Sequence, residues 1–171
     1  SKPILDLVQR LGGPFDLVFD AREAALDGLA SGITVAEADA VRAAGGECLT
    51  LVGSVTSLAD VMRHYAAIRE RWGGLDWAIL NAGVGGAMNA REFKAEHYHR
   101  MFETNIGGVV NWLEAVIPVM IAAGQGTIAG MASLAAFRGL PNTGAYCASK
   151  AAVLTLLEST RLELRGTGVS V

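Results

Sequence analysis

The sequence predicts an α/β fold in which parallel strands alternate with helices. Short apolar runs bounded by glycine alternate along the chain with longer segments of helical periodicity, which requires right-handed crossovers and a parallel sheet. Of the 171 residues 51% are apolar and 18% are charged, as is typical of a globular protein with buried strands. This length suffices for one domain with a substantial core, and we find no linker or internal repeat.

Most of the predicted helices have a recognisable start or stop. Thr34 and Glu37 have the spacing of a capping box, and Ser57 opens the next helix. Three glycine-rich segments each end a helical run, namely Gly12-Gly13-Pro14, Gly45-Gly46 and Gly73-Gly74. The helices expected are, in order, residues 4–11, 23–30, 34–44, 57–72, 94–122 with interruptions, and 144–165.

Short apolar runs between these helices predict the strands. The strands expected are, in order, residues 15–20, 48–52, 75–80, 127–132 and 168–171. The last of these follows a glycine-rich turn at the C-terminal end of the longest uninterrupted helix.

Charge and apolar patterning exclude several classes of partner. The net charge is −3 with no polybasic run, which argues against nucleic-acid binding. The longest apolar stretch, residues 109–123, is interrupted by Asn111, Glu114 and Pro118, so we do not expect it to span a membrane. The first residues lack the pattern of a signal peptide, and we expect a cytoplasmic protein.

Neither the cysteines nor the histidines have the spacing of a metal site. Cys48 and Cys147 form no disulfide framework, and we interpret both as reduced thiols. His64, His97 and His99 are not accompanied by a carboxylate-rich pattern. We therefore expect no bound metal.

Three polar side chains carry the most specific chemistry. Tyr146 and Lys150 lie four positions apart in a predicted helix, so they share one helical face. A cation beside a phenol favours the phenolate, which makes a group that is inert near neutral pH a usable proton donor and acceptor. Ser133 ends a predicted strand, where open α/β sheets place their ligands. A Tyr–Lys pair alone is more often an ordinary surface pair, so the interpretation depends on further motifs.

Four motifs in register resemble the short-chain dehydrogenase/reductase family. They are Leu80-Asn81-Ala82-Gly83, Asn105-Ile106-Gly107-Gly108, Ser133 and Tyr146-Cys147-Ala148-Ser149-Lys150, and the likeness runs from about residue 49 to the C-terminus. The resemblance implies a doubly wound, three-layer, Rossmann-like sheet, with residues 1–171 as a single, partial domain. It also implies a homodimer or homotetramer that transfers a hydride between NAD or NADP and a carbonyl or secondary alcohol.

The resemblance gives each of four catalytic residues a role. Tyr146 would be the general acid or base on the substrate oxygen, and Ser133 would orient and polarise that oxygen. Lys150 would favour the ionised phenol and hydrogen-bond the nicotinamide ribose. Asn105 would hold a water that links Lys150 to solvent, although a capping or helix-breaking role is the plain alternative.

The resemblance also implies a cofactor-binding set. It comprises Asp20, Ser54, Val55, Asn81, Ala82, Gly83, Tyr146 and Lys150. The Asp20 carboxylate would accept from the adenosine ribose 2′-hydroxyl and repel a 2′-phosphate, which favours NAD over NADP. Arg22 could pair with that phosphate, so NADP stays open, and Asp20 could instead cap a helix. The Asn81-Ala82-Gly83 run would pack on the adenosine ribose, but the same residues also make plain turns.

Several positions depart from the family pattern. The glycine-rich turn of the Thr-Gly-x3-Gly-x-Gly type has no match, because Gly12-Gly13-Pro14 follows a helix and precedes a strand. We therefore expect the chain to begin inside the helix after that turn and to stop before the substrate loop. Ser54 stands where the family commonly has Asp, and Leu80 where many members have Asn.

Two other classes of function stay open. A catalytically inactive or truncated relative would keep these side chains and act as a binding or oligomerisation module, which the missing phosphate-binding turn favours. A sugar-nucleotide epimerase or dehydratase shares the Tyr-x3-Lys pair, but the Ser133 spacing argues against it. The substrate is not determined, although Leu134, Ala135, Phe137 and Leu140 indicate an apolar wall.

Overall fold

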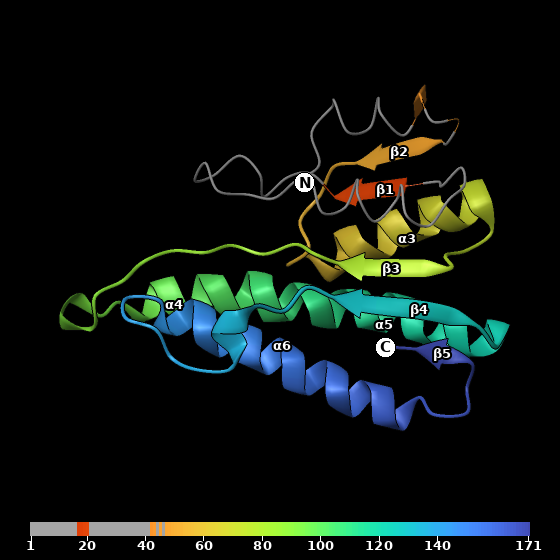
Figure 1. Cartoon of the computed structure of the whole chain (residues 1–171). Helices are drawn as coiled ribbons and strands as arrows, with labels where there is room; N and C mark the ends of the chain where they lie inside the picture. The colour runs from red at the N-terminus through yellow and green to blue at the C-terminus, as the bar shows by residue number, and fades with distance from the viewer. Residues whose placement is uncertain (1–16, 21–41, 44, 46) are drawn as a thin grey trace. The chain divides into compact units, whose positions relative to one another are not determined.

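The computed structural model describes residues 17–20, 42–43, 45 and 47–171, with the backbone alone for 17–20 (Figure 1). The chain divides into two compact units, Ser1–Ser54 and Val55–Val171, and each is described by itself. The helices expected at residues 4–11, 23–30 and most of 34–44 lie outside the described residues, as does Arg22.

The first unit contains a two-stranded parallel sheet. Strand β1, Leu17–Asp20, pairs with β2, Cys48–Leu51, in the register Leu17 to Cys48 and Asp20 to Leu51. Both strands were predicted from the sequence; residues 15–16 of the first prediction lie outside the described residues, and the second prediction extended one residue too far. Because the two carboxyl ends coincide, Asp20 ends its strand beside the point where the chain leaves β2 for Ser54.

The second unit is built on a three-stranded parallel sheet in the order β3-β4-β5. These strands are Trp77–Leu80, Gly126–Gly130 and Val169–Ser170. Strand β3 stays paired with β4 from Trp77 opposite Thr127 to Leu80 opposite Gly130. Parallel neighbours require helical crossovers, and these supply the helices of the unit (Figure 1).

Helix α3, Leu58–Trp72, begins and ends where the sequence predicts. The Ser57 side chain accepts a hydrogen bond from the Asp60 backbone N–H at 3.2 Å and so caps the N-terminus. Gly73 closes the helix with φ 83°, a left-handed conformation that suits glycine. The buried face of the helix includes Val61, Tyr65 and Ile68.

The next helical run is a single rod with one irregular turn. It consists of α4, Ala95–Phe102, then the π-helical turn η3, Glu103–Gly107, then α5, Gly108–Ala123. The sequence predicted an interrupted helix here. In a π-helical turn each backbone hydrogen bond spans five residues instead of the four of an α-helix. Such turns are frequent at functional sites. This turn contains Asn105.

Among the described residues, the run Ala95–Ala123 has the length and composition of a membrane-spanning helix, which differs from the expectation drawn from its polar interruptions. The core helix of a soluble protein passes the same test. Residues Val109, Leu113, Val116 and Met120 are buried in the hydrophobic core, and that burial accounts for part of the apolar sequence of α5.

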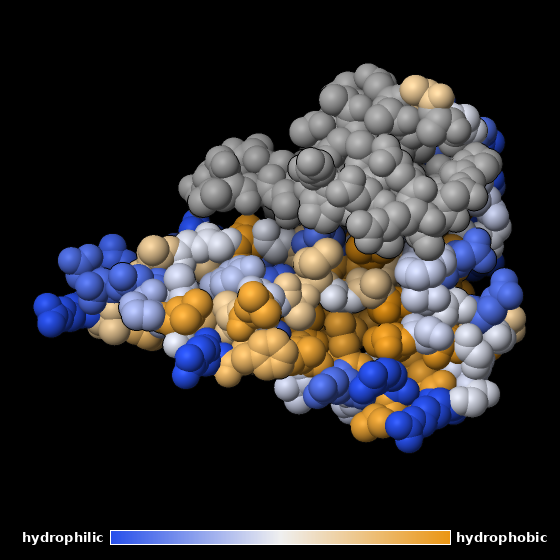
Figure 2. All heavy atoms as spheres, in the orientation of Figure 1, coloured by the Kyte–Doolittle hydropathy of each residue, from blue (hydrophilic) through white to orange (hydrophobic). Residues whose placement is uncertain are grey.

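Helix α6, Gly144–Glu163, crosses to the last strand and packs on β4. Its Val153 joins Ile128 of β4 and Val116 of α5 in the core. Glycine at position 130 lets the two elements approach, because a Cβ there would collide with the Leu157 side chain. Apolar side chains also gather on the visible surface over β4 and α6 (Figure 2).

Candidate active site

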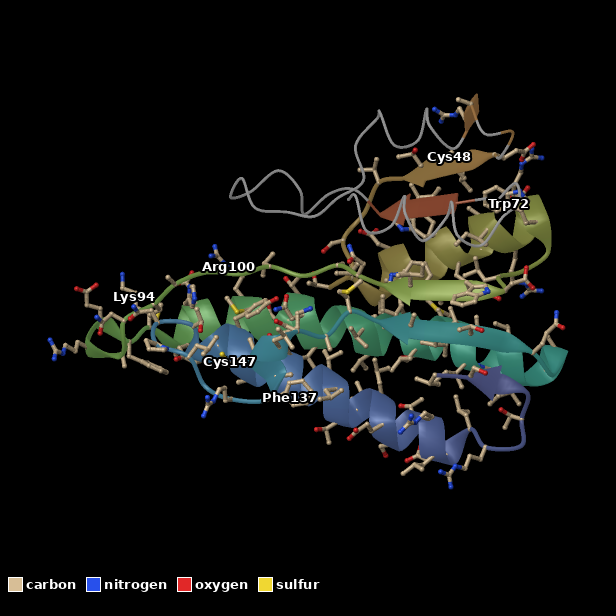
Figure 3. The ribbon with its side chains drawn as sticks, viewed as in Figure 1. Cys48, Trp72, Lys94, Arg100, Phe137 and Cys147 are labelled. Carbon is tan, nitrogen blue, oxygen red and sulfur yellow. The ribbon has the colours of Figure 1, made fainter. Side chains whose placement is uncertain are left out.

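Tyr146 and Lys150 lie near the start of α6, on one face of the helix. The Lys150 Nζ atom is 5.8 Å from the centre of the Tyr146 ring, as their spacing predicts. Figure 3 shows Cys147 on this N-terminal part of α6. Its thiol is buried and free, in agreement with a packed, reduced cysteine.

The Lys150 ammonium is buried and only partly satisfied by the protein. The side chain is 5% exposed, and its Nζ donates to the Met131 backbone C=O at 2.7 Å. Burial lowers the pKa of Lys150, because desolvation disfavours the charged form. An ammonium has three donors, and Met131 is its one acceptor among the described residues. Two donors therefore remain for a ligand or water.

The loop that follows β3 passes directly over this ammonium. A Cβ atom built on Gly83 would lie 3.5 Å from Lys150 Nζ and 3.3 Å from Asn105 Oδ1. Two residues later, a Cβ on Gly85 would lie 4.0 Å from the Tyr146 ring. The structure thus brings four predicted residues together: Gly83, Asn105, Tyr146 and Lys150.

Asn105 links two elements of the site by three side-chain hydrogen bonds. It is 1% exposed, and its Oδ1 accepts from the Val84 N–H at 2.7 Å. Its Nδ2 donates to the Val84 C=O and to Ser149 Oγ, both at 2.9 Å. Its side-chain amide therefore binds protein groups on two elements, and the predicted water-holding role remains a prediction.

Ser133 lies beyond the strand that was expected to end with it. Strand β4 ends at Gly130, because its partner β3 ends at Leu80, opposite Gly130. Ser133 instead caps the short 3-10 helix η4, Leu134–Ala136, and its Oγ accepts from the Ala135 N–H at 3.2 Å. No described residue accepts its hydroxyl hydrogen, so that donor is available to a substrate oxygen.

The remaining predicted cofactor residues fall into two groups. Asn81 and Ala82 follow β3 and are half-buried beside Gly83. Val55 is buried, and its carbonyl accepts from Asn111 Nδ2 at 2.8 Å, which ties it to α5. Asp20 and Ser54 belong to the unit Ser1–Ser54 and are described only within it.

The first turn of α6 is held by neighbouring segments. The Met88 N–H donates to the Asn142 carbonyl at 2.7 Å, which joins the loop after β3 to the residues just before α6. Asn142 has φ 61°, the left-handed conformation that Asn tolerates. A Cβ on Gly144 would lie 2.9 Å from the Tyr98 hydroxyl oxygen, so α4 packs closely against this turn.

The sequence-based reasoning did not select Ser149, Val84 or Met131. Ser149 is fully buried, and its hydroxyl donates to the Tyr146 carbonyl at 2.8 Å. A serine inside a helix, three positions after Tyr146, was the available signal, because such hydroxyls bond the preceding turn. Val84 and Met131 contribute backbone groups, for which the sequence carries no signal.

This donor set suits a nicotinamide cofactor. The two remaining donors of Lys150 match ribose hydroxyls, and Gly83 leaves the approach above them free of a side chain. Within the described part of the chain, no three His, Cys, Asp or Glu side chains are grouped so that they could hold a metal ion.

This chain is similar in sequence and in structure to known oxidoreductases. The family described as short chain dehydrogenase matches residues 22–171. An uncharacterized oxidoreductase of Myxococcus xanthus (strain DK1622) is 41% identical over 133 residues, 78% of this chain and 53% of that protein. A sorbitol dehydrogenase of Cereibacter sphaeroides is 39% identical over 118 residues, 68% of this chain and 46% of that protein.

Among solved structures, NAD+-bound xylitol dehydrogenase matches with a TM-score of 0.79 and 29% identity, over 91% of this chain and 57% of that one. The likeness confirms the predicted Rossmann-like α/β fold with a parallel sheet. The chain spans about half the length of the relatives it matches. These matches show that this chain belongs to the short-chain dehydrogenase family.

Proposed function

We propose that this chain carries the catalytic residues of a nicotinamide-dependent oxidoreductase that interconverts a carbonyl and a secondary alcohol. One observation carries the proposal: a buried lysine ammonium lies 5.8 Å from a tyrosine ring, and Met131 is its one acceptor in the described part of the chain. That arrangement suits proton transfer by the phenol next to a bound ribose.

Each residue then has a defined task. When bound, the nicotinamide supplies or accepts the hydride. Tyr146 gives a proton to the carbonyl oxygen during reduction and takes it from the alcohol during oxidation. The Ser133 hydroxyl donates to the same oxygen and orients it. Lys150 uses its two remaining donors on the ribose. Asn105 keeps the loop at Gly83 in place.

We infer NAD as the preferred cofactor, with NADP as the alternative. Asp20 is the last residue of β1, where a carboxylate would accept from a ribose 2′-hydroxyl and repel a 2′-phosphate. The NAD+-bound state of the xylitol dehydrogenase supports this choice. The names of that protein and of the sorbitol dehydrogenase make small polyols the first substrates to test.

We further propose a cytoplasmic homodimer or homotetramer in which residues 1–171 form part of one domain. Three large apolar side chains on α5 and α6 are exposed in the single chain, namely Val110, Ile121 and Leu162. Burial of such side chains between two copies would stabilise an oligomer. Sedimentation velocity of the purified protein tests this, and a monomer at all concentrations would contradict it.

The enzymatic proposal is tested by cofactor binding followed by turnover. The purified protein is titrated with NADH and with NADPH by nicotinamide fluorescence, then assayed with sorbitol, xylitol and simple ketones. Saturable binding with turnover supports an oxidoreductase. Binding without turnover on any substrate favours the alternative, a non-catalytic binding module. The absence of saturable binding refutes both nicotinamide proposals.

A further inference from the structure

A chain of hydrogen bonds runs through three elements of the site, and its central bond, from Asn105 to Ser149, is buried. It starts at Val84, whose N–H donates to Asn105 Oδ1 and whose C=O accepts from Asn105 Nδ2. The same Nδ2 donates to Ser149 Oγ at 2.9 Å, and Ser149 Oγ donates to the Tyr146 carbonyl at 2.8 Å. Three hydrogen bonds therefore connect the loop after β3, the turn η3 and helix α6, and the fourth lies within α6.

The linking side chains have no access to solvent. Asn105 is 1% exposed and Ser149 is 0% exposed. Water cannot replace a hydrogen bond that is lost there, so the geometry that satisfies every donor is strongly preferred. Each end of the chain lies at a residue of the site: Val84 adjoins Gly83, which lies close to Lys150 Nζ, and the other end is the backbone carbonyl of Tyr146.

Ser149 does more than the usual buried hydroxyl of a helix. Thr160 on the same helix is also buried and donates to a carbonyl of the preceding turn, Leu156, at 2.9 Å. That bond stays within α6. The bond of Ser149 continues to Asn105, 44 positions away in the sequence, so it determines where α6 sits relative to the loop over Lys150.

We propose that Ser149 is a positioning residue that, through Asn105, holds Tyr146 and Lys150 in register with the loop after β3. The inference rests on the proposed function, in which that loop lines the nicotinamide cofactor. Ser149 touches neither substrate nor cofactor in this role. It sets the distance between the proton-transferring phenol and the loop that positions the reacting carbon.

The test compares Ser149→Ala with Thr160→Val in the purified protein. Thr160→Val removes a buried hydroxyl of the same helix that has no partner on another element. Turnover and Michaelis constants are measured with NAD+ and the polyol that the wild-type protein oxidises fastest. We expect Ser149→Ala to lower kcat by about 10- to 100-fold with KM changed less than about threefold, and Thr160→Val to stay within about twofold.

A second readout does not depend on activity. Hydrogen exchange of the Val84 amide is followed without ligand, since that N–H donates to Asn105 Oδ1. We expect it to exchange at least about tenfold faster in Ser149→Ala than in wild type and to be unchanged in Thr160→Val. Ser149→Cys, which keeps a weak S–H donor, should lie between Ala and wild type and serves if Ser149→Ala fails to fold.

The outcomes separate the two proposals. Wild-type kcat in Ser149→Ala, a loss confined to KM, or an equal loss in Thr160→Val overturns the positioning role. Unchanged exchange at Val84 overturns it as well. If the wild-type protein binds neither NADH nor NADPH, the proposed function fails instead, and the exchange measurement alone decides whether Ser149 holds the loop.

Discussion

Gly83→Ala tests the close approach of the loop after β3 to Asn105 and Lys150. The added methyl would lie 3.3 Å from Asn105 Oδ1, below the ordinary contact range of 3.4–4 Å, and 3.5 Å from Lys150 Nζ. One side must therefore move by a few tenths of an ångström. Asn105 cannot rotate away without losing its hydrogen bonds to Val84 and Ser149. The loop is therefore expected to rise from the ammonium.

The stability cost of this change should be small. Weakening one hydrogen bond of Asn105 costs about 0.5–1.5 kcal/mol. Replacing glycine by alanine restricts the unfolded chain and contributes about 0.4–1 kcal/mol in the opposite direction. The free energy of unfolding should therefore change by less than about 1 kcal/mol. The displacement of the loop at the proposed cofactor site should weaken NADH binding and lower kcat by about tenfold or more.

Gly74→Ala is the matched control for this experiment. Gly74 has no heavy atom within 4 Å of a built Cβ and no positive φ, so alanine there should leave the free energy of unfolding unchanged or raise it slightly. Urea unfolding and NADH fluorescence titration are measured on both variants. If Gly83→Ala binds NADH and turns over as well as Gly74→Ala, the loop after β3 does not position the cofactor.

Three further predictions concern single residues. Tyr146→Phe should abolish turnover, while its affinity for NADH stays within about threefold of wild type, because only the proton-transferring oxygen is lost. A wild-type rate would contradict the role assigned to Tyr146. Ser57→Ala should lower the free energy of unfolding by about 1 kcal/mol through loss of the α3 cap, and Ser159→Ala, an exposed hydroxyl, is the control. Burial lowers the pKa of Lys150, so its charge destabilises the fold below the folded pKa, and this cost disappears as pH rises past about 10.4. The free energy of unfolding of the wild-type protein, measured relative to Lys150→Met, should therefore increase as pH rises from neutral towards about 11, where the titration ends. If the two proteins have parallel pH profiles, the lowered pKa of Lys150 is wrong.

Local signals in the sequence were sufficient for most individual elements. Ser57 and Gly73 mark the ends of α3, because capping and left-handed closure involve only neighbouring residues. The common face of Tyr146 and Lys150 follows from helical spacing alone. The parallel strands follow from the alternation of apolar runs with helices, which leaves few ways to connect them.

The contacts that make a site from these elements were decided only by the tertiary structure. The end of β4 at Gly130 depends on where its partner β3 stops, so the strand ends before it reaches Ser133. The bonds from Asn105 to Val84 and Ser149 join positions 21 and 44 residues apart, and two of the groups bonded belong to the Val84 backbone. Sequence patterns record side-chain type and short-range spacing. They carry no information on which distant backbone groups will face a buried amide, since packing of whole helices and strands determines that.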